Sequence, residues 1–89
     1  MKIHLLYFAW IREAVQKHAE EIEIPDNSDL TQLLLMLKSR YTQISAEIED
    51  MIHARSAMVM AINQNYTKDF TTILKPNDEI AFIPPISGG

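Results

Sequence analysis

The 89-residue chain contains no cysteine and only two glycines. Without cysteine, neither disulfide bonds nor a thiolate metal site can form. No run of apolar residues comes near the ~20 that a membrane-spanning helix needs. We therefore expect one globular domain, because a chain of this length has no room for two independent hydrophobic cores.

Positive charge is also scarce, since eight Lys and Arg stand against twelve Asp and Glu, for a net charge of −4. Nucleic-acid-binding domains normally carry a basic stripe, so nucleic acid is not an expected partner. The spacing of His4, His18 and His53 matches no familiar set of metal ligands, and we expect no metal site.

The first apolar segment, residues 2–8, has two possible interpretations. A signal peptide is one, but no small-residue cleavage site follows, and Arg12 and Glu13 interrupt the apolar stretch. A central strand is the better interpretation, and we expect its apolar side chains to be buried on both faces: Ile3, Leu5 and Tyr7 on one, Leu6 and Phe8 on the other. With no targeting segment expected and no affinity for membranes, the predicted location is the cytoplasm.

The remaining elements follow from the spacing of apolar residues. We predict a short helix at 9–17, strands at 20–24, 58–62 and 79–83, a short strand opening at Tyr66, and a second helical piece within 43–53. In 20–24 the isoleucines should face inward and the glutamates outward. The main helix should run from Asp29 to Tyr41, with Asp29 and Gln32 spaced as a capping box. Residues 75–78 suit a type I turn.

This order predicts an α+β fold in which the main helix packs on one face of a mixed sheet. The first and last strands should pair in parallel at its centre, as in β-grasp (ubiquitin-like) domains. Residues 1–83 would form this domain. Residues 84–89 would form an extended tail, because Pro84 and Pro85 cannot donate hydrogen bonds to a sheet.

Both glycines are the last residues, Gly88 and Gly89, so the turns of the body should be built with Asn, Asp, Pro or Ser. A terminal Gly-Gly can arise by chance. Behind two prolines, however, it forms a slender end that could enter another protein's active site and present a carboxylate. That carboxylate is an anion at neutral pH and must be activated, for example as an acyl-adenylate, before a nucleophile can attack it. With sulfur as the nucleophile, the product is a thiocarboxylate.

Three parts of the sequence carry a family resemblance: Phe8-Ala9-Trp10-Ile11-Arg12-Glu13, Met60-Ala61-Ile62-Asn63, and Asp78-Glu79-Ile80-Ala81-Phe82-Ile83-Pro84-Pro85-Ile86-Ser87-Gly88-Gly89. They resemble the small subunits of molybdopterin synthase. The resemblance implies a β-grasp sulfur carrier, non-catalytic alone, that works in a heterotetramer with the large synthase subunit. It also implies that a separate activating enzyme uses ATP to adenylate Gly89, while this chain itself binds no cofactor.

The resemblance further implies that the thiocarboxylate donates its sulfur to cyclic pyranopterin monophosphate in molybdenum cofactor biosynthesis. Phe82 would lie on the partner-facing surface, and the inserted tail would consist of Pro84, Pro85, Ile86, Ser87 and Gly88. Where relatives often have Gly before Asp-Glu, this chain has Asn77, which tolerates a left-handed backbone.

Other functions stay open at this stage: a sulfur carrier for thiamine thiazole synthesis, a ubiquitin-like protein modifier, or a plain interaction domain. Trp10 could anchor a partner or cap the core. Arg12 could contact an acidic partner, but an exposed ion pair with Glu13 or another neighbour is the simpler expectation. Met51, Met58 and Met60 favour core packing over a soft interaction surface.

Overall fold

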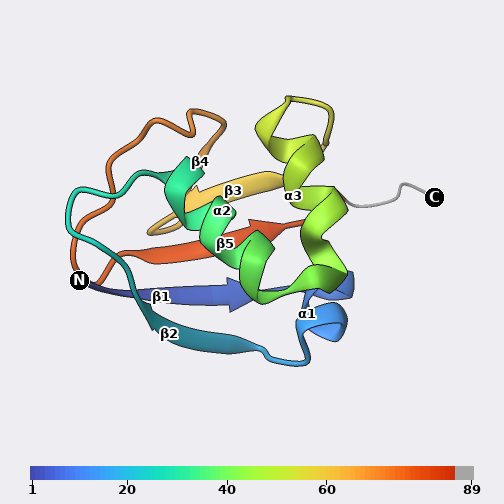
Figure 1. The fold of residues 1–89 in the computed structure, drawn as a ribbon, viewed down its shortest axis with the longest axis horizontal. Coiled ribbons are helices and arrows are strands. Elements are labelled where there is room, and N and C mark those ends of the chain that lie inside the picture. Colours follow the sequence, from blue (N-terminus) through green and yellow to red (C-terminus); the bar gives the residue numbers. More distant parts are fainter. Residues whose placement is uncertain (86–89) are drawn as a thin grey trace.

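A five-stranded mixed sheet organises the computed structural model, which describes residues 1–85 (Figure 1). The strand order is β2-β1-β5-β3-β4. β1 pairs in parallel with β5 and antiparallel with β2, while β3 pairs antiparallel with both β5 and β4. The strands are β1 (Lys2–Tyr7), β2 (Ala19–Glu23), β3 (Val59–Ile62), β4 (Asn65–Thr67) and β5 (Glu79–Ile83). The predicted parallel pairing of the first and last strands is confirmed.

Within the described residues, four helical segments complete the α+β fold, and the predicted main helix packs on the sheet (Figure 1). They are α1 (Ala9–Val15), α2 (Leu30–Arg40), the 3-10 turn η1 (Thr42–Ile44) and α3 (Ser45–Ile52). The predicted capping box is present, because the Asp29 carboxylate accepts from the Gln32 N–H and the Gln32 side chain accepts from the Asp29 N–H, each at 2.9 Å.

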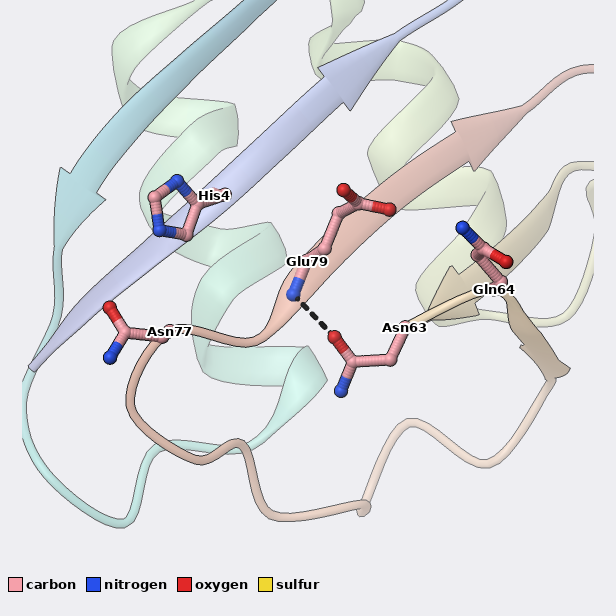
Figure 2. A pocket seen from close by; sticks show the side chains of 5 residues that line it. All are labelled: His4, Asn63, Gln64, Asn77 and Glu79. Carbon is pink, nitrogen blue, oxygen red and sulfur yellow. Dashed lines mark hydrogen bonds between the residues drawn. The ribbon is translucent and has the colours of Figure 1, made fainter.

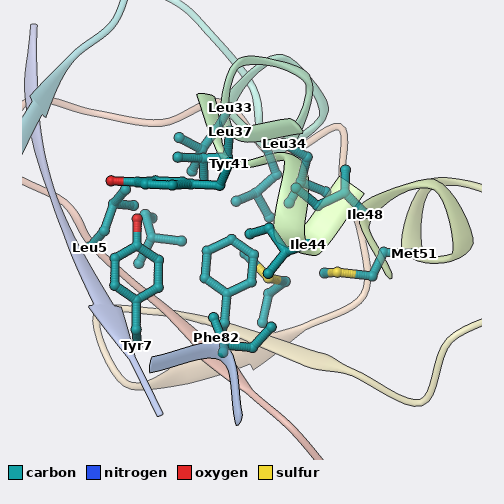
Figure 3. Packing of buried hydrophobic residues seen from close by; sticks show 14 of the residues in the cluster. Leu5, Tyr7, Leu33, Leu34, Leu37, Tyr41, Ile44, Ile48, Met51 and Phe82 are labelled. Carbon is teal, nitrogen blue, oxygen red and sulfur yellow. The ribbon is translucent and has the colours of Figure 1, made fainter. Parts of the chain in front are cut away.

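The core lies between the helices and the face of the sheet to which Ile3, Leu5 and Tyr7 point (Figure 3). The leucine stripe predicted for α2 is fully buried in this core: Leu30, Leu33, Leu34 and Leu37. The 3-10 turn and α3 add Ile44, Ile48 and Met51. Met58 and Met60 are also buried, so the prediction that the methionines pack in the core is confirmed.

The turns of the body use more residue types than the sequence suggested. Among residues 1–85, seven residues have positive φ. Four of them are Ala9, Gln16, Ala54 and Gln64 rather than the expected Asn, Asp, Pro or Ser. A side chain with a Cβ is disfavoured in this conformation by roughly 1–2 kcal/mol. Tertiary contacts therefore override local preference at these positions.

The turn before β5 also differs from the prediction. The Asp78 N–H donates to the Lys75 carbonyl at 3.1 Å, as in any four-residue turn, but Asn77 at its third position has φ 68°. A type I turn has negative φ there, whereas a type II turn needs positive φ. The expectation of a type I turn is wrong, and the expectation that Asn77 accepts a left-handed backbone is confirmed.

The last strand ends where expected, since β5 stops at Ile83 and Pro84 and Pro85 belong to no strand. The assignment of 84–89 as a tail stays a prediction, because 86–89 lie outside the described residues. Within residues 1–85, no helix has the length and apolar character required to cross a bilayer.

Candidate functional site

The second face of the sheet carries an apolar surface at the end where β1 and β5 stop. Leu6 and Phe8 were expected to be buried on this face, but Leu6 is only half-buried and Phe8 is 45% exposed. That expectation is wrong, because the helices supply their buried side chains to the opposite face. A contiguous patch of large, solvent-exposed apolar side chains is typical of a binding surface.

A shallow cavity of about 260 Å³ lies in the middle of this surface. We call it the socket; its lining residues are Leu6, Phe8, Ala61, Gln64, Tyr66, Glu79, Ala81 and Ile83. Ala61 and Ala81 are directly paired between β3 and β5, and both are nearly buried. Tyr66 on β4 is 74% exposed. Two alanines thus lie at the centre of larger side chains, which makes the surface concave.

The strand that leads into the tail places successive side chains on opposite faces. Phe82 is 1% exposed and stacks on Tyr7 with ring centroids 5.9 Å apart, so its side chain lies in the core. The expectation that Phe82 lies on a partner-facing surface is therefore wrong. Its neighbour Ile83 lines the socket instead. Pro84 is half-buried and Pro85 is exposed.

The rest of the predicted tail, Ile86, Ser87, Gly88 and Gly89, lies outside the described residues. Their assigned roles, and those of Pro84 and Pro85 in partner binding, stay predictions. The socket residues Tyr66 and Glu79 were not predicted from the sequence. For Tyr66, the sequence indicated a short extended segment, which is too short to assign the side chain to one face of a sheet.

Polar side chains occupy the other half of the same sheet face (Figure 2). His4, Asn63, Gln64, Asn77 and Glu79 line a wide, shallow depression there. Asn63 organises it: its Oδ1 accepts from the Glu79 N–H at 2.9 Å, and its Nδ2 donates to Asp78 at 2.8 Å. Among residues 1–85, no three His, Cys, Asp or Glu side chains are grouped so that they could hold a metal ion.

Two surface residues singled out in the sequence are now placed. Trp10 is 43% exposed on α1 and so does not simply cap the core. The Arg12 guanidinium lies 3.4 Å from His18 Nδ1. Among residues 1–85 the arginines that form ion pairs are Arg40 and Arg55, so the expected ion pair of Arg12 with Glu13 or another neighbour is wrong.

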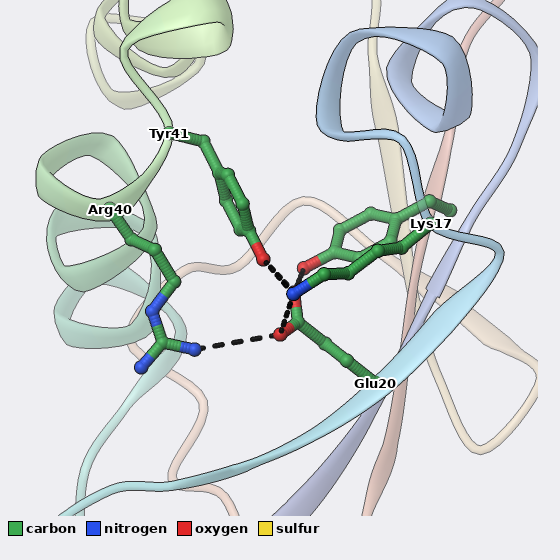
Figure 4. Close-up of polar contacts among 5 residues, drawn as sticks. Lys17, Glu20, Arg40 and Tyr41 are labelled. Atoms are coloured by element: carbon green, nitrogen blue, oxygen red, sulfur yellow. Dashed lines mark hydrogen bonds and ion pairs between the residues drawn. The ribbon is translucent and has the colours of Figure 1, made fainter.

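One polar cluster was missed because the glutamates of β2 were all expected to face outward. Glu20 faces inward, as the period of two counted back from Ile22 requires. Its carboxylate accepts from the hydroxyls of Tyr7 at 2.6 Å and Tyr41 at 2.5 Å (Figure 4). Lys17 and Arg40 approach its other oxygen at 3.4 and 3.5 Å.

The cluster shifts two pKa values. Partial burial alone would raise the pKa of the Glu20 carboxyl, but the hydrogen bonds from Tyr41 and Tyr7 and the charge of Lys17 outweigh it and lower that pKa. Burial, followed by the hydrogen bond to Glu20, strongly raises the pKa of Tyr7. Glu20 is therefore ionised at neutral pH and joins α2 to the sheet.

Comparison with known proteins identifies the family of this chain. A model of the ThiS family matches residues 5–89. The chain belongs to the ThiS family. Among curated relatives of this ThiS-family chain, the molybdopterin synthase sulfur carrier subunit of Dictyostelium discoideum is 38% identical over 87 residues, which cover 96% of this chain and 93% of the relative.

Solved structures share the fold of this ThiS-family chain. The small archaeal modifier protein 1 of Methanosarcina acetivorans matches with a TM-score of 0.78 and 26% identity, covering 99% of this chain and 96% of that one. A chain from the complex of subunits 1 and 2 of the molybdopterin-converting factor of Helicobacter pylori matches with a TM-score of 0.67 and 19% identity, with both chains fully covered (100%). These likenesses identify the ThiS-family domain as a ubiquitin-like β-grasp fold.

Proposed function

We propose that this chain is the sulfur carrier subunit of molybdopterin synthase, and that the carboxylate of Gly89 carries the sulfur. Membership of the ThiS family supports the proposal, as do relatives of that name that match nearly the whole chain. The observation that carries it in the structure is the position of the socket. It lies on the sheet face at the end of β5, directly before the Pro-Pro-Ile-Ser-Gly-Gly segment.

The chemistry begins with activation of the Gly89 carboxylate. One carboxylate oxygen attacks the α-phosphorus of ATP, forms an acyl-adenylate and releases diphosphate. Hydrosulfide, supplied by a separate sulfur donor, then attacks the acyl carbon and forms the C–S bond as the bond to AMP breaks. AMP leaves, and the chain ends in a thiocarboxylate. This chain has no cysteine with which to form that bond by itself, so a separate activating enzyme and a sulfur donor are required.

Docking would deliver the charged tail. The large synthase subunit covers the apolar face around Phe8, Tyr66 and Ile83, and the tail enters its active site. Ordering an extended tail costs on the order of 1–2 kcal/mol per residue. Burial of the exposed aromatic and aliphatic surface at about 25 cal/mol per Å² offsets this cost. In this scheme the chain is not catalytic alone, and sulfur passes to cyclic pyranopterin monophosphate within the complex.

Intact-protein mass spectrometry tests the proposal. After incubation with ATP, a sulfur source and the activating enzyme, we expect the mass change of one oxygen replaced by one sulfur. A variant with one residue appended after Gly89 should keep its stability and lose the exchange. Continued sulfur transfer by that variant would refute the assignment of Gly89.

A second candidate is attachment to lysine side chains, favoured by the 26% identity to an archaeal modifier protein. Lysine adducts in the same mass experiment would support it. A carrier for thiamine thiazole synthesis would show the same sulfur exchange but would co-purify with a thiazole-pathway partner instead of the large synthase subunit.

A further inference from the structure

The socket has an apolar floor of two small side chains between larger ones. The floor consists of Ala61 and Ala81, which lie side by side on β3 and β5 and are 3% and 7% exposed. Phe8 and Tyr66 line it as well, and both are large and exposed. A single unbranched aliphatic side chain of a partner can contact this floor between Phe8 and Tyr66, whereas a flat partner surface would rest on those larger side chains.

One side of the socket is acidic. Glu79 lines it together with Gln64, and Figure 2 shows the Glu79 carboxylate between His4 and Gln64. Within residues 1–85, Glu79 has no ion pair, since the nearby His4 approaches Glu21 at 3.4 Å instead. The Glu79 backbone N–H is bonded to Asn63, which fixes the residue's position in β5.

The apolar floor and the Glu79 carboxylate together indicate which kind of side chain can bind in the socket. A purely apolar side chain would cover the Glu79 carboxylate without pairing it, and an uncompensated buried charge is strongly destabilising. An acidic side chain would be repelled. Lysine and arginine combine an aliphatic stem with a cationic head, so that the stem can lie on apolar surface while the head reaches a charge.

We infer that the socket receives a lysine or arginine side chain of the protein that docks on this face, with its head paired to Glu79. This inference rests on the proposed function, because it assigns the chemistry of the same docking surface. The net charge of −4 is consistent with a basic partner. The ion pair sets specificity, and the surrounding apolar surface supplies most of the affinity.

Binding of purified large synthase subunit to the full chain, measured by surface plasmon resonance at low and high salt, tests the inference. Glu79→Gln should weaken binding roughly tenfold, mainly through faster dissociation, and should reduce the dependence of the affinity on salt. Ala81→Leu fills the socket and should weaken binding at every salt concentration. Both variants should keep the thermal midpoint of the parent chain.

Two further variants serve as controls. Glu23→Gln makes the same charge change on β2, where the carboxylate is exposed, and should leave binding nearly unchanged. Phe8→Asp should abolish docking whatever fills the socket. Wild-type affinity for both socket variants, together with loss of binding for Phe8→Asp, would overturn the inference and leave the docking face intact.

Two other outcomes would also overturn the inference. If Ala81→Leu weakens binding and Glu79→Gln does not, the socket receives an apolar side chain and the cationic occupant is wrong. If Phe8→Asp binds as tightly as the parent chain, the docking face itself is wrong, and the inference fails with it. Sulfur exchange at Gly89 would be unaffected by that last result, which separates the two failures.

Discussion

Replacing Glu20 by alanine should destabilise the fold far more than any other single carboxylate deletion on β2. Its side chain is only 11% exposed and holds the hydroxyls of Tyr7 and Tyr41. A hydrogen bond to a charged group contributes about 1.5–3 kcal/mol. Two such bonds give a loss of about 3–6 kcal/mol. The loss is large because Tyr7 is fully buried and its hydroxyl would be left without an acceptor. The exposed cations, Lys17 and Arg40, add little.

The matched control is the next residue. Glu21 points to the opposite face, where it pairs with Lys2 and His4 at 3.5 and 3.4 Å on a surface open to solvent. Such pairs contribute about 0–1 kcal/mol. Urea denaturation followed by circular dichroism gives the free energy of unfolding for Glu20→Ala and Glu21→Ala. Equal losses for the two variants would refute the buried network as a source of stability.

The pH dependence of unfolding provides a second measurement of the same group. The pKa of Glu20 is lower in the folded chain than its ordinary value, so its contribution is present above about pH 4.3 and is lost as the pH falls through the folded pKa. Glu20→Gln cannot titrate. Its stability should therefore fall less steeply than that of the parent chain between neutral pH and the acid range. Parallel curves would show that Glu20 is not held in its charged form by folding.

Three further predictions concern four substitutions, the first two of which are compared with each other. Phe82→Ala should lower the free energy of unfolding by about 3–5 kcal/mol, because it leaves a cavity in the core. Ile83→Asp should leave the unfolding midpoint nearly unchanged and abolish partner binding. Denaturation curves and binding assays on both variants distinguish the two effects. Ala54→Gly should stabilise the chain by about 1 kcal/mol, because Ala54 has φ 57° on an exposed turn; a lower denaturation midpoint would contradict this. Asp29→Ala should cost about 1 kcal/mol in the same assay by removing the cap of α2, and no change would contradict it.

Strong local signals carried most of the fold. The capping box at Asp29 and the leucine stripe behind it fixed both the start and the buried face of α2. The apolar character of the first and last strands indicated their central, parallel pairing. The errors fell where tertiary contacts override local preference. At Ala9 and Ala54 the chain adopts left-handed backbone that no local rule assigns to alanine.

The errors at the candidate site share one physical origin. A strand with apolar residues on both sides does not reveal which face the helices will cover, and both faces of β1 and the end of β5 have this character. Burial on both faces was the natural expectation, yet the helices cover only the face that bears Tyr7 and Phe82. The second face therefore carries more apolar surface than a sheet face exposed to water normally does. The proposed docking of a partner accounts for Leu6, Phe8 and Ile83, which in the isolated chain leave apolar surface exposed around the socket.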